Sequence, residues 1–290
     1  MKGIILAGGT GSRLWPITIS VSKQLLPVYD KPLVYYPLST LMLAGVKEIL
    51  IIANPKDKLA FEKIFGNGHH LGLDISYEIQ NKPEGIAQSF LIAKTFIQTD
   101  KVCLILGDNI FHGNGLGRQL SKNTNVEGAT IFGYEVDEPE SYGVVEFDER
   151  NNIKSIEEKP SSPRSRYAIP GIYFFDNTVV QKAEKVQKSK RGEYEITSVL
   201  QMYLNAGNLN LEILPRGTAW MDCGTVESMN DAANYIKSIE LRQGMKIGSI
   251  EEIAWRNGWI TSSQLLEISK NSPENEYSCY LARIANLIQK

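Results

Sequence analysis

The segment GIILAGGTGSRLWP, residues 3–16, begins as a short apolar run and continues as a loop with three glycines and an arginine. An apolar run of this length fits a strand that is buried on both faces of a parallel sheet. Backbone N–H groups without side-chain cover can approach phosphate closely, so a glycine-rich loop after a strand is typical of nucleotide sites. The segment therefore predicts an α/β fold with a phosphate-binding loop after its first strand.

This loop matches neither of the two common phosphate-binding motifs. Arg13 stands where the third glycine of a dinucleotide fingerprint would pack, and no acidic residue ends a second strand at the required distance. A Walker loop needs Gly-Lys-Ser or Gly-Lys-Thr, which the chain lacks. These differences argue against an NAD-dependent oxidoreductase and a P-loop enzyme. Arg13 and Lys23 both lie in the segment that follows the first expected strand, and two cations there favour binding of a triphosphate. The alternative is a tight turn that binds no ligand.

The composition is that of an ordinary soluble globular protein. With 290 residues, 42% of them hydrophobic, and a formal net charge of −2, the chain has no charge bias that would favour a nucleic-acid polymer or a membrane. Cys103, Cys223 and Cys279 lie far apart, which is typical of free thiols in a reducing compartment. No apolar stretch approaches the roughly 20 residues of a membrane span. We therefore expect a cytoplasmic protein.

Alternating strand-like and helical patterns predict a parallel sheet covered by helices in the first part of the chain. The expected strands are 3–7, 48–53, 75–79 and 102–106, and the expected helices are 34–44, 56–65 and 86–97. Shorter strand-like runs then predict a mixed extension of the sheet, with strands 129–134, 143–147, 171–175 and 209–214 and helices 178–187, 196–206 and 225–242. Ser249 with Glu252, and Thr261 with Gln264, predict capping boxes that open the helices of a small C-terminal subdomain.

Several motifs in chain order carry a resemblance to a known family. They are LAGGTGSRLWP, SKQLLPVYDKPLVYYPLSTLMLAG, GDNIF, YGVVEFD, EEKP, GIYFFD, RGEYEIT, MDCGT and IEEIAWRNGWI. Together they resemble the sugar-1-phosphate nucleotidyltransferases, and most closely their thymidylyltransferase branch. The resemblance implies a Rossmann-like (GT-A-like) α/β fold with a mixed, mainly parallel sheet flanked by helices. We expect a nucleotidyltransferase domain over 1–243 (nucleotide-binding part about 1–110, sugar-phosphate-binding part about 111–243) and a C-terminal helical subdomain over 244–290.

The resemblance also implies a reaction. A deoxythymidylyl group would pass from dTTP to glucose 1-phosphate, giving pyrophosphate and dTDP-glucose for dTDP-deoxysugars such as dTDP-rhamnose in polysaccharide biosynthesis. The alternatives are a uridylyl- or cytidylyltransferase of the same family and a non-catalytic nucleotide-sugar sensor. A sensor tends to lose the metal-binding aspartates or the phosphate-binding cations. This chain keeps Arg13, Lys23, Asp108, Lys159 and Asp222, which favours an enzyme.

In-line displacement at an α-phosphate depends on stabilising spread negative charge, and Mg²⁺ held by one or two carboxylates is the usual means. Asp108 follows the apolar run VCLIL and Asp222 follows AWM, so both are expected at strand ends. Both resemble the metal-binding aspartates of the family, which implies a Mg²⁺ cofactor. The attacking phosphate oxygen is already largely ionised at neutral pH, so no general base is needed.

Placed cations must offset the repulsion between two anionic substrates. The resemblance gives Arg13, Lys23 and Lys159 the catalytic role, the first two on the triphosphate and Lys159 on the sugar phosphate. It gives nucleotide binding to Gly8, Gly9, Gly11, Arg13, Lys23, Gln24, Gln80, Gly85 and Asp108. The amides of Gln24 and Gln80 offer a donor and an acceptor, which suits thymine or uracil in one orientation and cytosine when flipped.

The same resemblance gives sugar-phosphate binding to Asn109, Gly143, Glu158, Lys159, Ile169 and Tyr173. It further implies a homotetramer with a regulatory nucleotide site that involves Gly115, Glu252 and Arg256. Three positions depart from the common family pattern, namely Pro170, Ser198 and Cys223, and none of them removes a proposed charge. Because Cys223 adjoins Asp222, we expect activity to be sensitive to thiol reagents.

Overall fold

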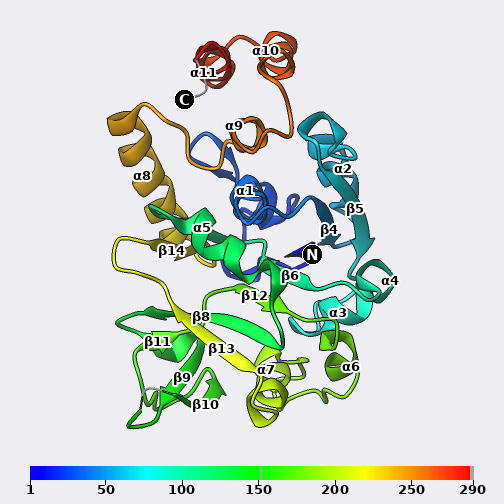
Figure 1. Cartoon of the computed structure of the whole chain (residues 1–290), viewed down its shortest axis with the longest axis vertical. Coiled ribbons are helices and arrows are strands. Elements are labelled where there is room, and N and C mark those ends of the chain that lie inside the picture. The colour runs from blue at the N-terminus through cyan, green and yellow to red at the C-terminus, as the bar shows by residue number, and fades with distance from the viewer. Residues whose placement is uncertain (151, 288–290) are drawn as a thin grey trace.

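The computed structural model describes residues 1–150 and 152–287, which form a mixed sheet flanked by helices (Figure 1). Within these residues the sheet has ten strands, in the order β10-β9-β11-β8-β12-β6-β1-β4-β5, with β13 paired to β8. The predicted α/β class and mixed sheet are confirmed. Of the described helices, none has both the length and the apolar character that crossing a membrane requires.

The parallel part of the sheet comes from the first part of the chain. Its strands are β1 (Lys2–Ala7), β4 (Glu48–Ala53), β5 (Asp74–Ile79) and β6 (Val102–Leu106). β1 lies between β4 and β6, so that Ile5 pairs with Ile51 on one side and Ile105 on the other. Successive side chains of a strand point to opposite faces, and Ile4 and Ile5 accordingly enter two different buried clusters. This explains why the run is apolar at consecutive positions.

Helices cover both faces of this part. On one face lie α1 (Tyr35–Leu43) and α2 (Lys58–Phe65), and on the other lie α3 (Gln88–Ile92) and α4 (Lys94–Ile97). The predicted helix 86–97 is thus two short helices that meet at Ala93. Short 3-10 turns are η1 (Ser12–Leu14), η2 (Lys23–Leu25), η3 (His69–Leu71), η4 (Lys122–Asn125) and η5 (Pro139–Ser141).

The middle of the chain extends the sheet, mostly by antiparallel pairing. The strands are β8 (Ala129–Glu135), β9 (Gly143–Phe147), β10 (Ile153–Glu158), β11 (Tyr167–Ala168), β12 (Ile172–Phe175) and β13 (Leu209–Ile213). α5 (Leu116–Ser121) packs on the α1 face, whereas α6 (Val179–Ala183) and α7 (Ile196–Asn205) pack on the α3 face. The strands β10 and β11 were not predicted, because their sequences are charged or very short.

Two small ribbons lie outside the main sheet. β2 (Pro27–Val28) pairs with β3 (Lys31–Pro32), and β7 (Asn109–His112) pairs antiparallel with β14 (Ala219–Asp222). The second ribbon joins the end of β6 to the segment that precedes α8 (Val226–Gln243). It therefore brings two predicted site segments together.

The C-terminal helices are α9 (Ile250–Arg256), α10 (Ser262–Asn271) and α11 (Glu276–Ala285), at the opposite end of the long axis from β9 and β10 (Figure 1). The predicted capping box at Thr261 is confirmed, since Gln264 N donates to Thr261 Oγ1 at 3.2 Å and Thr261 N donates to Gln264 Oε1 at 2.8 Å. The box predicted at Ser249 is wrong, because its side chain makes no cap hydrogen bond. Ser249 Oγ instead accepts from the hydroxyl of Tyr277 at 3.2 Å.

Candidate active site

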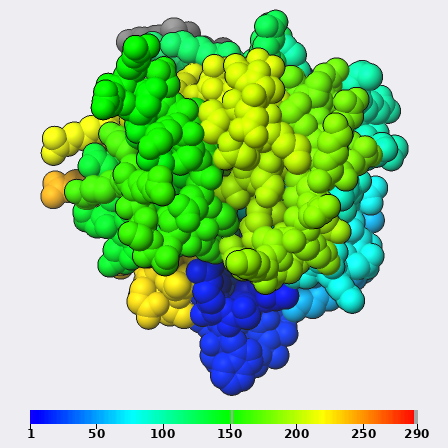
Figure 2. All heavy atoms as spheres, turned by 90° about the horizontal axis from the view of Figure 1, so that it is seen from below, coloured from blue at the N-terminus to red at the C-terminus, as the bar shows by residue number. Residues whose placement is uncertain are grey.

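The candidate site lies at the edge of the sheet where parallel strands end. Arg13 and Lys23 lie in the connection after β1, and Asp108 follows β6 with only Gly107 between them. Open α/β sheets bind ligands at this edge. Figure 2 shows the N-terminal segment in blue meeting parts of the chain near residues 150, 190 and 220, coloured green, yellow-green and yellow.

A cavity of about 290 Å³ opens on the side of the glycine loop. From the predicted nucleotide-binding set it is lined by Gly9, Arg13, Lys23, Gln24, Gln80, Gly85 and Asp108. Gly8 and Gly11 belong to the same loop. Gly85 has a φ of 110°, and a Cβ there would lie 2.5 Å from the backbone of Tyr194. Only glycine fits this wall, for both reasons.

A second cavity, about 170 Å³, adjoins the first. Its lining contains every residue predicted to bind the sugar phosphate, namely Asn109, Gly143, Glu158, Lys159, Ile169 and Tyr173. Arg13, Asp108 and Lys159 line both cavities, and Asp222 lines the second. Two ligands in these cavities would thus meet beside the same charged groups.

The backbone holds the two aspartates side by side. Asp222 is the register partner of Asn109 in the β7–β14 ribbon, and Cys223 N donates to the carbonyl oxygen of Asp108 at 2.9 Å. The Asp108 carboxylate is paired with the ammonium of Lys23 and accepts from Asn109 Nδ2 at 2.9 Å. In contrast, Asp222 Oδ1 is buried without a hydrogen-bond partner within the described residues.

These surroundings shift the two carboxyl groups in opposite directions. Burial and, to a smaller extent, the neighbouring Asp108 charge raise the pKa of Asp222 to about 6, against the opposing effect of Lys23, Arg13 and Lys159. For Asp108 burial also disfavours the charged form, but the Lys23 charge and hydrogen bonds from Lys23 and Asn109 hold its pKa below the usual range. The pair therefore keeps one carboxylate neutralised by a lysine and one without a partner.

The donor set fits a hard divalent cation. An unpartnered buried carboxylate oxygen beside a second carboxylate offers the oxygen ligands that Mg²⁺ prefers. In residues 1–150 and 152–287, no group of three or more His, Cys, Asp or Glu side chains is arranged around a metal position. Mg²⁺ is commonly held by one or two carboxylates together with substrate phosphates and water, so two aspartates suffice.

Lys159 is held in an unusual backbone conformation at the junction of the cavities. Its φ is 46°, in the left-handed region that non-glycine residues seldom adopt, and Pro160 follows directly. Its backbone N–H donates to the carbonyl of Tyr142 at 3.0 Å. Such a conformation costs on the order of 1 kcal/mol and recurs at functional sites.

Asn109 supports the wall of the second cavity. Its Oδ1 accepts from Gly171 N at 3.0 Å and from Trp220 Nε1 at 2.6 Å, while its Nδ2 is bonded to Asp108. Both polar atoms of its side chain thus have partners within the protein, and one of these partners is the Asp108 carboxylate. Glu158, in the same cavity, has a raised pKa because of burial and the nearby Glu195 charge, with Lys159 and Arg191 opposing the shift.

Sequence reasoning missed three residues at this site. Arg191 lines both cavities and lies 3.4 Å from Glu158 Oε1, and Trp220 lines the second cavity. Gln88 bonds to the side chain of Gln80 from outside the first cavity. Arg191 is the first residue of the motif RGEYEIT, and this motif could have indicated it as a site residue. For Gln88 the sequence holds no such signal.

The structure argues against the expected thiol sensitivity at Cys223. Its side chain is 0% exposed, and burial together with the charges of Asp108 and Asp222 raises its pKa to about 12. A buried protonated thiol is a poor nucleophile. Of the three cysteines, only Cys279 is exposed.

The predicted regulatory residues lie away from both cavities. Glu252 and Arg256 line a separate cavity of about 220 Å³ together with Leu116, the neighbour of Gly115. Arg256 Nε donates to Glu252 Oε1 at 2.7 Å, and Tyr280 donates to the other carboxylate oxygen. The three residues thus gather in one region of the structure.

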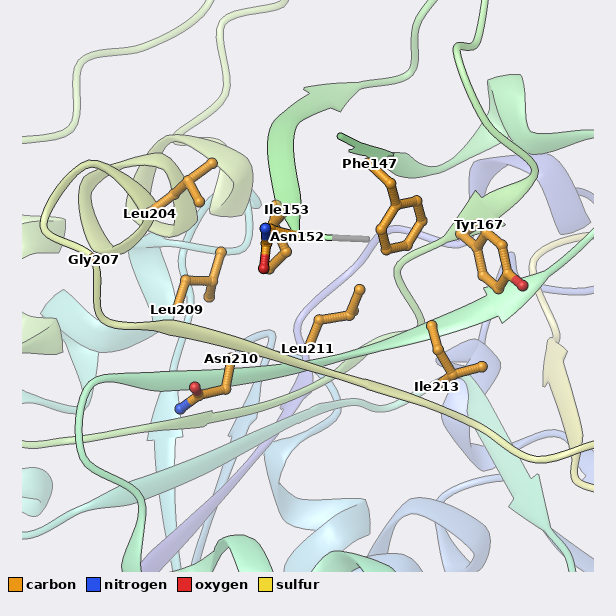
Figure 3. Close-up of a pocket in the computed structure, with 10 residues that line it drawn as sticks. All are labelled: Phe147, Asn152, Ile153, Tyr167, Leu204, Gly207, Leu209, Asn210, Leu211 and Ile213. Carbon is orange, nitrogen blue, oxygen red and sulfur yellow. The ribbon is translucent and has the colours of Figure 1, made fainter. Parts of the chain in front are cut away.

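A wider cavity of about 570 Å³ lies between β13 and the β9–β10 strands (Figure 3). Leu209, Leu211 and Ile213 of β13 face Phe147 across it, and Tyr167 closes one side. Among the described residues that line it, none carries a charge. It therefore offers no cationic side chain to a phosphate group.

Comparison with known proteins agrees with this geometry. Residues 2–239 match the model of the nucleotidyl transferase family. The glucose-1-phosphate thymidylyltransferase of Mycolicibacterium smegmatis is 55% identical over 98% of this chain and 99% of its own. The enzyme of the same name from Neisseria meningitidis is 50% identical over 98% of this chain and 99% of its own.

Solved structures share the fold. A Bacillus anthracis protein described as a glucose-1-phosphate thymidylyltransferase, in complex with sucrose, has a TM-score of 0.74 and 38% identity over 81% of this chain and 94% of its own. A UDP-glucose pyrophosphorylase complexed with UDP-glucose has a TM-score of 0.72 and 24% identity over 82% of this chain and 98% of its own. The second likeness supports the fold alone.

Proposed function

Because this chain belongs to the nucleotidyl transferase family, we propose that it transfers a deoxythymidylyl group from dTTP to glucose 1-phosphate, giving dTDP-glucose and pyrophosphate. The observation that carries the proposal is that two adjoining cavities share Arg13, Asp108 and Lys159. Two anionic substrates must be brought together for this reaction, and shared cations at the junction offset their repulsion.

The lining of each cavity suggests which substrate it takes. The glycine-loop cavity contains the amides of Gln24 and Gln80 for the base and Arg13 and Lys23 for the triphosphate. The second cavity contains Glu158 as an acceptor for sugar hydroxyls and Lys159 for the sugar phosphate. An oxygen of that phosphate, which is largely ionised at neutral pH, would attack the α-phosphate, so no side chain needs to remove a proton.

The charged groups would then act by position. Arg13 and Lys23 would hold the triphosphate and stabilise the departing pyrophosphate, and Lys159 would hold the attacking phosphate. Asp108 and Asp222 would hold Mg²⁺, which when bound supplies electrostatic stabilisation of the reacting phosphate. Asn109 keeps the Asp108 carboxylate oriented through its hydrogen bond of 2.9 Å.

Two features of the wider setting belong to the same proposal. Glu252, Arg256 and the neighbourhood of Gly115 would form a regulatory nucleotide site, with Arg256 as the cation for its phosphate. The enzyme would act in the cytoplasm as a homotetramer, and its product would supply dTDP-deoxysugars such as dTDP-rhamnose. The sensor alternative is disfavoured because Arg13, Lys23, Asp108, Lys159 and Asp222 converge on the two cavities.

The proposal is tested by measuring pyrophosphate release with dTTP, UTP and CTP, each combined with the 1-phosphates of glucose, galactose and mannose. The highest kcat/KM is expected for dTTP with glucose 1-phosphate, and no release is expected without a divalent cation. A strong preference for CTP would overturn the proposed base. Binding of nucleotide without release in every combination would indicate a sensor.

A further inference from the structure

The amide of Gln80 is held by a neighbour that does not line the nucleotide cavity. Gln80 lines this cavity and is 2% exposed. Its Nε2 donates to Oε1 of Gln88, the first residue of α3, at 2.7 Å. The orientation of the Gln80 amide therefore depends on the orientation of the Gln88 amide.

The orientation of Gln88 is fixed by two partners whose roles cannot be exchanged. The backbone N–H of Glu84 donates to Gln88 Oε1 at 3.1 Å, and Gln88 Nε2 donates to the Glu84 carboxylate at 3.1 Å. A backbone N–H only donates and a carboxylate only accepts. Lys188 Nζ donates to the other oxygen of Glu84 at 2.5 Å, so that both carboxylate oxygens accept hydrogen bonds. If the Gln88 amide were flipped, its Nε2 would face the backbone N–H of Glu84, and its Oε1 would face the Glu84 carboxylate. Neither contact could be a hydrogen bond.

This arrangement leaves the carbonyl oxygen of Gln80 for the ligand. Its Nε2 is used by Gln88, and within the described residues no donor bonds to its Oε1. The Oε1 points to the glycine loop, since a Cβ on Gly8 would lie 2.1 Å from it. Gln80 thus presents its carbonyl oxygen, in a fixed orientation, as an acceptor to a base in this cavity, while the second N–H of Nε2 remains a donor.

We propose that Gln88 is a positioning residue that fixes Gln80 as an acceptor and so selects pyrimidines that carry an N3–H. Thymine and uracil have this donor, whereas N3 of cytosine is an acceptor and would face the Gln80 oxygen without a hydrogen bond. The inference rests on the proposed function in that the nucleotide lies in the glycine-loop cavity. It explains why an amide that could serve either class of base serves one here.

The test compares kcat/KM for dTTP and dCTP in the wild type and in Gln88→Met, which has a similar shape but no amide. If turnover of dCTP is too slow to measure, the inhibition constant of dCTP as a competitor of dTTP is compared instead. In the variant Gln80 is free to flip, so the preference for dTTP over dCTP should fall by about tenfold, the value of one hydrogen bond. Equal losses for both nucleotides would overturn the inference, since a purely structural role moves both together.

Two further variants show whether Gln88 acts through Gln80. In a Gln80→Met background, Gln88→Met should change the dTTP/dCTP preference by less than about twofold, because the group that it positions is absent. Gln201→Met is the matched control, since it removes a hydrogen-bonded glutamine of α7 whose partner is Asn205. It should leave the preference unchanged. An undiminished effect of Gln88→Met without Gln80 would contradict the positioning role.

A measurement on the wild type does not depend on any variant folding. N3-methyl-dTTP lacks the N3–H. Its inhibition constant against dTTP should therefore be at least about tenfold higher than the Kd of dTTP. Equal affinity would overturn the inference while the proposed function stood. A wild-type enzyme that fails to turn over dTTP at all would instead refute the proposed function, so the two failures are distinguishable.

Discussion

The backbone N–H of Cys223 donates a hydrogen bond to the carbonyl oxygen of Asp108, with 2.9 Å between the two atoms. This bond continues the β7–β14 ribbon by one step beyond its last register pair, Asp222 with Asn109. It therefore fixes Asp222 beside Asp108 by main-chain contacts, although the two carboxylates repel each other. The proposed metal position is preorganised in this way by the backbone.

We expect Asp222→Asn to lower the rate of pyrophosphate release by at least about a hundredfold, because an amide is a weaker ligand for Mg²⁺ and carries no charge. Thermal stability should be equal or higher, because Asp222 Oδ1 is buried without a partner within the described residues. Initial rates and the midpoint of thermal unfolding check both parts. Asp231→Asn, on the exposed side of α8, is the matched control. Near-normal turnover in Asp222→Asn would contradict the metal assignment.

The buried pair of Lys23 and Asp108 predicts a coupled effect on stability. Lys23→Met leaves the Asp108 carboxylate buried without its cation, and the free energy of unfolding should fall by about 3–5 kcal/mol. The double variant Lys23→Met/Asp108→Asn should be more stable than the sum of the single effects predicts. Denaturant unfolding of the four proteins measures this coupling. Strictly additive losses would show that the pair does not interact.

Gly224 leaves room for the guanidinium of Arg13 next to Asp222. A Cβ at Gly224 would lie 2.8 Å from Arg13 Nη2 and 3.1 Å from Asp222 Oδ1. Because the end of an arginine side chain can move, Gly224→Ala should displace Arg13 and lower kcat by about tenfold without unfolding the protein. Gly217→Ala would be a poor control because its φ is 95°, whereas Ser238→Ala on α8 changes no site contact. An unchanged kcat in Gly224→Ala would show that Arg13 is not needed in this position.

Asp176 predicts how stability depends on pH. Burial disfavours its charged form, but hydrogen bonds from Thr178, Tyr203 and Gly128 N hold its pKa below the usual 3.8. A lowered pKa stabilises the fold at pH values above 3.8, and this contribution is lost as the pH falls through the folded-state pKa. Asp176→Asn should therefore cost about 1 kcal/mol near neutral pH, after allowance for partial exposure.

The measurement for Asp176 is denaturant unfolding of both proteins between pH 7 and pH 3. The difference in unfolding free energy should shrink as the pH falls below 3.8, because the wild-type side chain then loses its charge too. A difference that stays constant over this range would mean that the charge of Asp176 does not contribute.

The predictable part of the fold is the part whose sequence is dictated by burial on both faces of the sheet. β4 and β6 have the predicted bounds. Helices cover both faces of the sheet here, so consecutive residues of these strands are buried and apolar. β10 was missed because its sequence IKSIEE is charged, and at this edge of the sheet Lys154 and Glu157 are exposed, so that no continuous apolar run marks the strand. β7 and β14 were not predicted as a ribbon, since pairing between segments far apart in the chain leaves no local pattern.

In the site as well, residues that carry a local sequence pattern could be predicted, whereas residues whose contacts depend on the fold could not. Asp108, Lys159 and the glycine loop were predicted because their types and motifs carry phosphate chemistry. Gln88 was not, because its role comes from three hydrogen bonds that only the fold assembles. Ser249 shows the reverse case, in which a local capping pattern is overridden by tertiary contacts with Tyr277.

A crystal structure of the enzyme with dTDP-glucose and Mn²⁺ in place of Mg²⁺ tests the central claim most directly, namely that the two cavities hold the two substrates beside one metal position. The anomalous signal of Mn²⁺ should lie between the carboxylates of Asp108 and Asp222, with the base beside Gln80 and the sugar beside Glu158. A metal peak away from both aspartates, or product bound in the uncharged cavity along β13, would contradict the account.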